Sequence, residues 1–412
     1  YYASRGLGDV YKRQCMYLKI KTYLKMKYEK YFKESKDGIY LFAYAFMLLS
    51  EIWDVSAASH NPFRYTFTST VLLLVYEYLT GSKKSFIITA FFTAGIFSLI
   101  WLKVPIISKN MFLCMLFVYT ARKINFERIG KFTLFFTGAV VLFIVFCAYM
   151  GFLPNYSFTG RVRTAMGFGY PLFLPAYLMN ITMLAVYLYR KDMKHSGRLL
   201  LFVLNMLVYI KCDGRISFAC ASCFLVCEPI LKFLEKNVSR LHKWFSLSIL
   251  SFPIGLVVSF AVTLSYGGKS QWVILLNSLL LERLRLGYEG LQIYGIQPFY
   301  QKIEWIGSGF ALKGEPLPGK YNWIDNLYIR NYVDNGFIVA TLFFAFLTFA
   351  AYAGWKRRDY LFLTIMALCA VHGMIDDSMM RLDRNTFLLL CGSMIYQELH
   401  QTNNVYLKGQ KI

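Results

Sequence analysis

Apolar residues occur along the chain in blocks of roughly 16–22 residues that are separated by shorter polar linkers. A helix of about 20 apolar residues is long enough to cross a hydrocarbon core of about 30 Å. The pattern therefore predicts an all-α, polytopic helical membrane protein with about 12 transmembrane helices. We expect these spans near residues 38–54, 64–80, 85–102, 106–120, 132–152, 170–189, 199–211, 216–231, 244–265, 335–354, 360–375 and 385–398.

Lysine and arginine are concentrated in every second linker, as in the pair Lys83 and Lys84. Basic linkers face the cytoplasm in most membrane proteins. The alternation therefore predicts a multi-pass protein of a plasma membrane with both termini in the cytoplasm. It also places two polar segments outside, at about 153–169 and 267–334. Within the larger one, Leu279–Tyr294 has the apolar pattern of an amphipathic helix lying in the outer membrane interface.

The ends of the chain are expected to lie outside the helical bundle. Residues 1–14 (YYASRGLGDVYKRQ) are interpreted as an assembly artefact, because DVYKRQ resembles the translation of a sequencing adapter. Residues 15–37 are rich in lysine and are predicted to form a basic cytoplasmic segment in contact with anionic lipid. The bundle is expected to occupy residues 38–398, and residues 399–412 are expected to form a cytoplasmic tail.

Composition supports a membrane protein and argues against nucleic-acid binding. Of the residues, 57% are hydrophobic and 17% are charged, whereas soluble domains contain about 45–50% and about 25%. The net charge of +22 comes mainly from the short linkers, where basic residues act as topology signals. The nine cysteines lie mainly in or beside apolar blocks, without the spacing of a zinc site. No nucleotide-binding or metal-binding motif occurs, so we expect neither a metal nor another cofactor.

Two arginine pairs fall in segments predicted to lie outside, against the usual bias of topology. Arg161 and Arg163 precede Gly167 at the start of a span, where guanidinium groups and a helix N-terminus favour phosphate. The alternative is a pair that snorkels to the lipid headgroups. Arg283 and Arg285 lie on the predicted amphipathic helix, where the alternative is binding of anionic headgroups.

Acidic groups and one histidine in the same outer regions are candidates for proton transfer. Asp325 lies between Trp323 and Tyr328, and aromatic rings beside a carboxylate suit a sugar; the alternative is a helix cap. His372 lies near the outer end of a predicted span and is followed by two aspartates, and an ionisable residue in a membrane suggests function. A helix-to-helix hydrogen bond for the histidine and a cap for the first aspartate are the alternatives. Secondary candidates are Asp376, Glu282 and Tyr328.

Four segments together resemble the Wzy-type polysaccharide polymerases, a family of O-antigen-ligase-like membrane glycosyltransferases. RVRTAMGFGYP at Arg161–Pro171 is similar to their arginine and glycine stretch before a proline, and LRLGYEGLQIYGIQPFYQ at Leu284–Gln301 is similar to a second stretch. Tyr321–Gly336 resembles the return of the family's large external loop to the membrane. Ala370–Leu389 is similar to their C-terminal histidine, glycine and aspartate segment.

The resemblance implies a reaction at the outer face of the plasma membrane. A growing oligosaccharide chain on undecaprenyl diphosphate is transferred to a new lipid-linked repeat unit during capsule, exopolysaccharide or O-antigen biosynthesis. It implies a diphosphate site at Arg161, Arg163, Arg283 and Arg285, and Asp325 or His372 as the base. The expected partners are the lipid-linked oligosaccharide, membrane lipids, and the chain-length regulator and flippase of the same pathway. Neither a metal nor a sugar nucleotide is required.

Three other functions remain open from the sequence. A ligase-like transferase would deliver the same sugar chain to a different acceptor. A transporter or flippase would move lipid-linked oligosaccharide, although charged residues here lie mostly near the ends of spans. A structural or sensory membrane protein would leave the external arginines unexplained.

Overall fold

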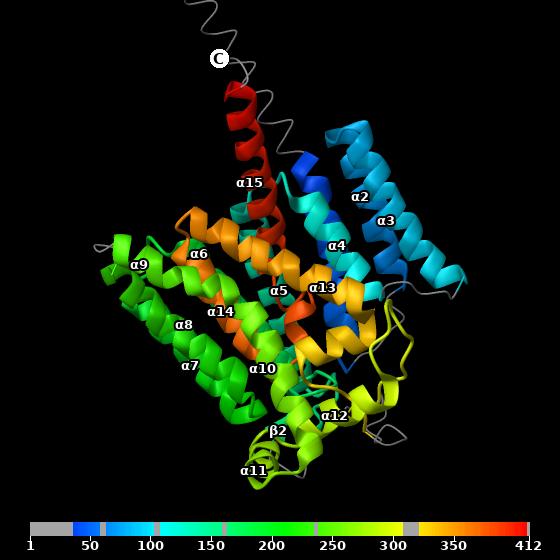
Figure 1. Ribbon diagram of the computed structural model, residues 1–412, viewed down its shortest axis with the longest axis vertical. Coiled ribbons are helices and arrows are strands. Elements are labelled where there is room, and N and C mark those ends of the chain that lie inside the picture. The colour runs from blue at the N-terminus through cyan, green and yellow to red at the C-terminus, as the bar shows by residue number, and fades with distance from the viewer. Residues whose placement is uncertain are drawn as a thin grey trace, which may run out of the picture.

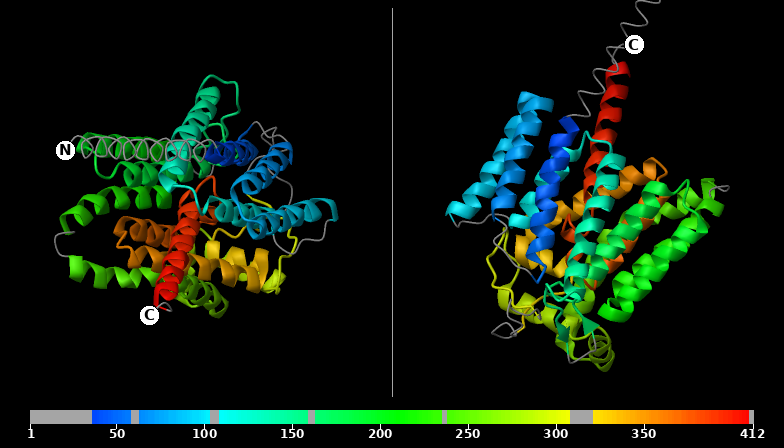
Figure 2. Two further views of the ribbon diagram at one scale, coloured as in Figure 1. Left: turned by 90° about the horizontal axis from the view of Figure 1, so that it is seen from above. Right: turned by 180° about the vertical axis from the view of Figure 1, so that it is seen from behind.

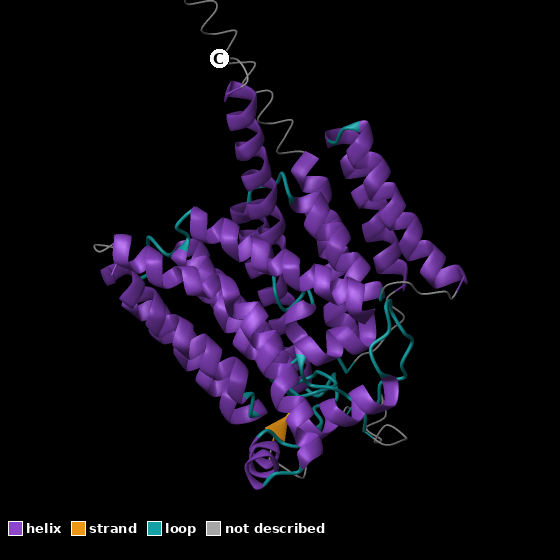
Figure 3. Cartoon of the chain, in the orientation of Figure 1, coloured by secondary structure: helices purple, strands orange, loops and turns teal. Residues whose placement is uncertain are grey.

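The computed structural model describes residues 36–57, 63–102, 108–158, 163–234, 238–307 and 321–409, and this part of the chain is mostly helical (Figure 3). Its only strands are β1 (Ser157–Phe158) and β2 (Arg163–Thr164), which form one short antiparallel ribbon. The expectations for residues 1–35 and for Arg161 lie outside the described residues.

Each apolar block expected from the sequence contains a helix. Residues 36–54 are helical. The other helices are α2 (Phe63–Thr80), α3 (Lys83–Leu102), α4 (Lys109–Ala121), α5 (Phe126–Tyr149), α6 (Phe173–Tyr189), α7 (His195–Cys212), α8 (Arg215–Leu234), α9 (Val238–Phe245), α10 (Ser251–Ser265), α11 (Gln271–Leu279), α12 (Arg283–Tyr294), α13 (Leu327–Lys356), α14 (Tyr360–Gly373) and α15 (Phe387–Gly409), with short 3-10 turns η2 (Ser246–Leu250), η3 (Tyr266–Gly268) and η4 (Ser378–Met380). Of these, α9, α11 and α12 lie largely outside the expected apolar blocks.

Four of the described helical segments are long and apolar enough to cross a membrane, namely Phe126–Tyr149, Arg215–Leu234, His242–Gly268 and Leu327–Lys356. On α5, Phe135 is 81% exposed and Leu142 is 69% exposed. Apolar side chains exposed in this way on a long helix are suited to lipid contact. A helical protein with membrane-spanning helices is thus supported, and the larger number of spans stays a prediction.

The bundle has two chemically different ends (Figures 1 and 2). We call one the loop end; it carries α11, α12, the β ribbon and residues 295–307. The opposite end, near the C-terminus, we call the basic end, and its turns include residues 122–125, 190–194 and 357–359. The basic turns therefore collect at one end of the bundle, as the alternation of basic linkers predicts.

The helix α13 begins at Leu327, earlier than the expected start near residue 335, because the Asn326 side chain caps it by accepting from two backbone N–H groups. It is broken at Gly336, which has φ 81° and ψ 168°. The backbone N–H of Phe337 donates instead to the carbonyl of Gln297 at 2.8 Å, and a Cβ at residue 336 would collide with Phe299. The last part of the expected external loop, residues 327–335, is therefore a short half-helix that is hydrogen-bonded to residues 297–301.

The expected amphipathic helix over Leu279–Tyr294 begins later than predicted. α11 ends at Leu279 and α12 starts at Arg283, because Leu281 and Glu282 adopt the left-handed conformation with φ 57° and 67°. The helix itself is confirmed from residue 283 onward, and it buries Leu284 and Leu286.

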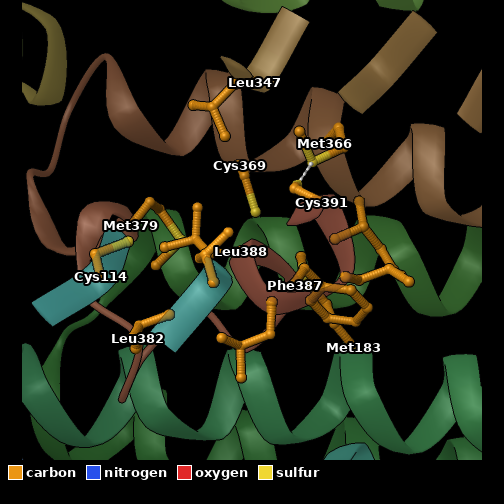
Figure 4. Packing of buried hydrophobic residues seen from close by; sticks show 14 of the residues in the cluster. Cys114, Met183, Leu347, Met366, Cys369, Met379, Leu382, Phe387, Leu388 and Cys391 are labelled. Carbon is orange, nitrogen blue, oxygen red and sulfur yellow. Dashed lines mark hydrogen bonds between the residues drawn. The ribbon is translucent and has the colours of Figure 1, made fainter. Parts of the chain in front are cut away.

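A continuous hydrophobic core joins α4, α6, α13, α14 and α15 (Figure 4). Sulfur-containing side chains fill much of it, and the Cys391 Sγ lies 3.7 Å from the Met366 Sδ. The eight cysteines among the described residues are all free thiols. Thiols and thioethers are soft and adaptable, so they pack where helices of uneven spacing meet. This core fixes the helices whose loop-end extensions build the site.

Candidate functional site

A cavity of about 660 Å³ opens at the loop end, between segments that are far apart in the sequence. One wall is formed by residues 54–57 and 169–173. The Gly169 N–H donates to the Val55 carbonyl at 2.9 Å, and the Ala57 N–H donates to the carbonyl of the nearby Gly167 at 2.9 Å. Gly167 has a φ of 86°, and a Cβ there would collide with the Ile144 carbonyl. The remaining walls come from residues 321–325, the start of α13 and residues 376–384.

Arg330 enters the cavity from the first turns of α13 and is only 6% exposed. Its nearest carboxylates are at long range: Nε lies 4.0 Å from Asp334 and Nη1 lies 3.7 Å from Asp377. Neither nitrogen has a hydrogen-bond partner among the described residues, although both are buried. A buried guanidinium without hydrogen bonds is costly, so these donors are available to an anion.

Arg384 repeats this arrangement on the segment before α15. It is 4% exposed, and its Nε is 3.6 Å from Asp383. Its Nε and Nη2 are buried and likewise find no hydrogen-bond partner in the described part of the chain. Arg381, also at the cavity, is better matched and lies 2.5 Å from Glu51. The cavity thus gathers three arginines, two of which have unused donors.

Two indole rings, tilted by 65° to each other, contact the Arg330 guanidinium. Its Cζ lies 3.8 Å from the ring centre of Trp305 and 4.1 Å from that of Trp323. Arginine stacks well on aromatic faces, and such contacts are strongest where water is excluded. Both tryptophans also line the cavity. The rings therefore fix the position of the cation while offering apolar faces to a ligand.

Asp325 faces the cavity beside these arginines, with 17% of its side chain exposed. It accepts a hydrogen bond of 3.2 Å from the Tyr321 hydroxyl, and the Arg283 Nε lies 3.6 Å away. Burial raises the pKa of Asp325 to about 7, and Arg283 opposes this rise. The expected alternative role as a helix cap belongs to its neighbour Asn326 instead. Asp325 is therefore a carboxyl group that can exchange a proton near neutral pH.

His372 is fully buried on α14 and contacts the Ser217 hydroxyl of α8 at 3.0 Å, which is the helix-to-helix hydrogen bond considered above. It does not line the cavity. Asp376 does, and its carboxylate also accepts from the Ser378 backbone at 2.8 Å, so it caps a short turn. The histidine is separated from the cavity by this turn, whereas the aspartate is part of the cavity.

The other predicted site residues are spread over the loop end. Arg283 reaches the cavity only through Asp325, and Arg163 is partly buried with its guanidinium 5.4 Å from the Tyr170 ring, which lines the cavity. Arg285 lies on the surface of α12 and pairs with both Glu282 and Glu289 at 2.8 Å. Tyr328 is fully buried and donates to the Ala370 carbonyl at 2.9 Å. The structure thus brings Asp325, Asp376 and Arg283 together and leaves Arg285 and Tyr328 outside.

Sequence reasoning missed Arg330, Arg381 and Arg384 as candidate site residues. Arg161 was singled out because it is an arginine predicted to lie outside the membrane, against the topology bias. The same argument applies to Arg381 and Arg384, which lie in the linker before the last span. Arg330 also lies in a segment predicted to be outside, at about 267–334, so the same argument could have found it. None of these signals shows that the three side chains meet.

The fold and the cavity define a mostly helical protein with membrane-spanning helices and an arginine-rich, carboxylate-bearing cavity at one end. No known protein family, curated protein or solved structure matches the chain.

Proposed function

We propose that the chain is a polysaccharide polymerase of the lipid-linked kind, working at the outer face of a bacterial plasma membrane. In this proposal the loop end faces outward, and the protein spans the membrane about 12 times. The cavity at the loop end binds the diphosphate of an undecaprenyl-linked oligosaccharide and transfers its sugar chain to a new lipid-linked repeat unit.

The proposal rests on one observation. Arg330 and Arg384 line the same cavity, and both have buried N–H donors without hydrogen-bond partners among the described residues. A diphosphate bears several oxygens that accept hydrogen bonds from guanidinium forks. Charge develops on this group as the sugar leaves, and fixed donors in a site with little water stabilise such charge strongly. The buried arginines thus take the role that the sequence assigned to Arg161, Arg163, Arg283 and Arg285.

The chemistry needs a base for the attacking sugar hydroxyl, and Asp325 is suited to this task. In the proposed step, the acceptor oxygen forms a bond to the anomeric carbon of the donor chain. The bond from that carbon to the diphosphate oxygen breaks, and its electron pair leaves with undecaprenyl diphosphate. The hydroxyl proton passes to Asp325, whose pKa of about 7 matches neutral conditions. Trp305 and Trp323 present ring faces of the kind that pack on sugars.

The test uses bacterial cells whose envelope polysaccharide depends on this chain. Cells carrying Arg384→Gln should hold the protein at normal levels and yield only single repeat units on lipid. Arg215→Gln is the matched control, because Arg215 is 66% exposed and pairs with Asp213 away from the cavity. A ladder of long chains from the Arg384 variant would overturn the assignment of this cavity.

The two alternative functions give different products in the same cells. A ligase-like transferase would leave chain length unchanged and prevent attachment to the final acceptor. If the chain is a flippase, its loss would leave lipid-linked repeat units on the inner leaflet of vesicles. Chain growth from units that are already outside would not change.

A further inference from the structure

The basic end contains a second cavity, of about 470 Å³, on the side of the bundle opposite to the proposed active site. It lies between the last residues of α6, the end of α8, the turn from α13 to α14, and α15. Five of its lining residues are basic: Arg190, Lys191, Lys232, Arg357 and Arg358. Two lining residues are acidic, Glu228 and Asp359. The cavity therefore has an excess of positive charge.

Both carboxylates already have partners. Glu228 lies 2.7 Å from Arg198 and also 2.7 Å from Lys232. Asp359 pairs with Arg190 at 3.4 Å and accepts from the Tyr187 hydroxyl at 2.7 Å. The acids of the cavity are thus used by the protein itself.

Three cations remain in the cavity. Lys191, Arg357 and Arg358 form no ion pair with any carboxylate in the described part of the chain. Arg357 donates from Nη1 to Gln397, but its Nε and Nη2 are buried and lack hydrogen-bond partners among the described residues. Arg358 adopts a left-handed φ of 58°, a conformation that usually favours glycine at the end of a helix. The strained backbone of Arg358, next to the buried donors of Arg357 that lack partners, suggests that these positive charges bind a ligand.

Aromatic side chains place this cavity at the level of a membrane surface. Trp244 on α9 is 67% exposed, and Trp355 stacks on His242 with ring centres 4.4 Å apart. Tyrosine and tryptophan collect where the hydrocarbon meets the headgroups. The cavity lies at the end of Leu327–Lys356, one of the four segments long enough to cross a membrane, and its lining residue Tyr360 packs against His242 with ring centres 6.3 Å apart.

We infer that this cavity binds a phosphate-bearing anion through Lys191, Arg357 and Arg358, and that its source is the headgroup of an anionic phospholipid. Basic pockets between helices at the cytoplasmic side are suited to such headgroups. The inference does not depend on the proposed polymerase activity, because it concerns the opposite end of the bundle.

The test measures the melting temperature of the purified full chain in detergent at constant ionic strength. Dioleoylphosphatidylglycerol, dioleoylphosphatidylcholine or sodium phosphate is titrated into the wild type and into two triple variants. The site variant is Lys191→Gln with Arg357→Gln and Arg358→Gln. The control is Lys83→Gln with Lys84→Gln and Lys123→Gln, which removes the same charge from exposed positions at the same end.

The wild type and the control should be stabilised by phosphatidylglycerol and much less by phosphatidylcholine. The site variant should need at least about tenfold more phosphatidylglycerol for the same stabilisation, since a tenfold change is about 1.4 kcal/mol, which the loss of a single charge-assisted hydrogen bond already supplies. Equal protection by free phosphate would support the anion site and assign it to a soluble source. Equal responses of the site variant and the wild type, or no response to either anion, would overturn the inference.

Discussion

Arg122 at the basic end and the two arginines of the loop-end cavity, Arg330 and Arg384, are buried in different ways. At the basic end, Arg122 donates to Glu77 at 2.7 Å and to the Tyr119 carbonyl and Ser85 hydroxyl. At the loop end, Arg330 and Arg384 meet carboxylates only at 3.6–4.0 Å and retain buried donors without partners. The side chains are similarly buried, with 8%, 7% and 5% exposed.

This difference separates a structural ion pair from a binding site. A buried charge with a close partner and hydrogen bonds stabilises the helices that contribute it, and removing one partner leaves the other uncompensated. A buried charge with unused donors costs stability until an anion supplies the missing hydrogen bonds. The contrast therefore predicts opposite effects on stability when Arg122 and Arg330 are each replaced by glutamine.

The largest expected effect is that of Asp325→Asn on polymerisation. Loss of a general base typically lowers the rate by about 10²–10⁴-fold. The base must be ionised, so the wild-type rate should increase with pH up to about 7 and then level off, while the residual rate of the variant should not follow this profile. Initial rates of chain extension between pH 5 and pH 9 measure both. An unchanged profile in the variant would remove Asp325 from the reaction.

The next largest effect is that of Arg122→Gln on stability. Breaking this buried pair should lower the free energy of unfolding by about 3–5 kcal/mol, because Glu77 is only 2% exposed and would be left without its cation. Thermal unfolding of the purified chain gives the comparison. The double variant Arg122→Gln with Glu77→Gln should recover part of the loss, and the absence of any recovery would contradict the pairing.

Arg330→Gln should behave in the opposite way. Its rate of chain extension should fall by about 10²–10³-fold, the usual effect of removing a donor from developing charge. Its melting temperature should stay the same or increase, because a poorly matched buried charge is removed. A fall in stability as large as that of Arg122→Gln would contradict the distinction between the paired Arg122 and the poorly paired Arg330.

A smaller effect is expected from the indole rings around Arg330. Trp323→Leu should lower the rate by about tenfold, or about 1.4 kcal/mol, since cation–π contacts contribute from about 1 kcal/mol at exposed sites to about 2 kcal/mol when desolvated. Trp272→Leu is the matched control, because Trp272 is 58% exposed on α11 and does not line the cavity. Equal rates for the two variants would mean that the ring does not position Arg330.

The smallest effect concerns Asp325 as a buried acid. Its raised pKa means that the folded protein favours the protonated form, so its contribution to stability is present at low pH and is lost as the pH increases through about 7. Asp325→Asn should therefore increase the melting temperature by a few degrees at pH 8 and by clearly less at pH 5, because the stability is lost progressively between about pH 4 and pH 7. The same increase at both pH values would argue against the raised pKa.

Helix positions could be predicted from the sequence because the length of an apolar block is a local property. The break at Gly336 could not, because it depends on backbone groups of residues 297–301 that are distant along the chain. Asp325 was found as a candidate because aromatic residues flank it, while Arg330 was missed because its two tryptophans come from separate segments. Apolar periodicity identifies the elements of this fold, but it does not show which polar side chains share a cavity.

The break in α13 also has a mechanical consequence. The backbone of residues 297–301 takes over hydrogen bonds on both sides of Gly336, including Gln301 N–H to the Asp334 carbonyl at 3.1 Å. These hydrogen bonds attach the half-helix that carries Arg330 to residues 297–301. It does not continue as a regular helix into the long apolar half of α13. A movement of residues 297–301 would therefore move Arg330 as well. An insertion among these residues would uncouple the half-helix from the rest of α13 without changing any residue that lines the cavity.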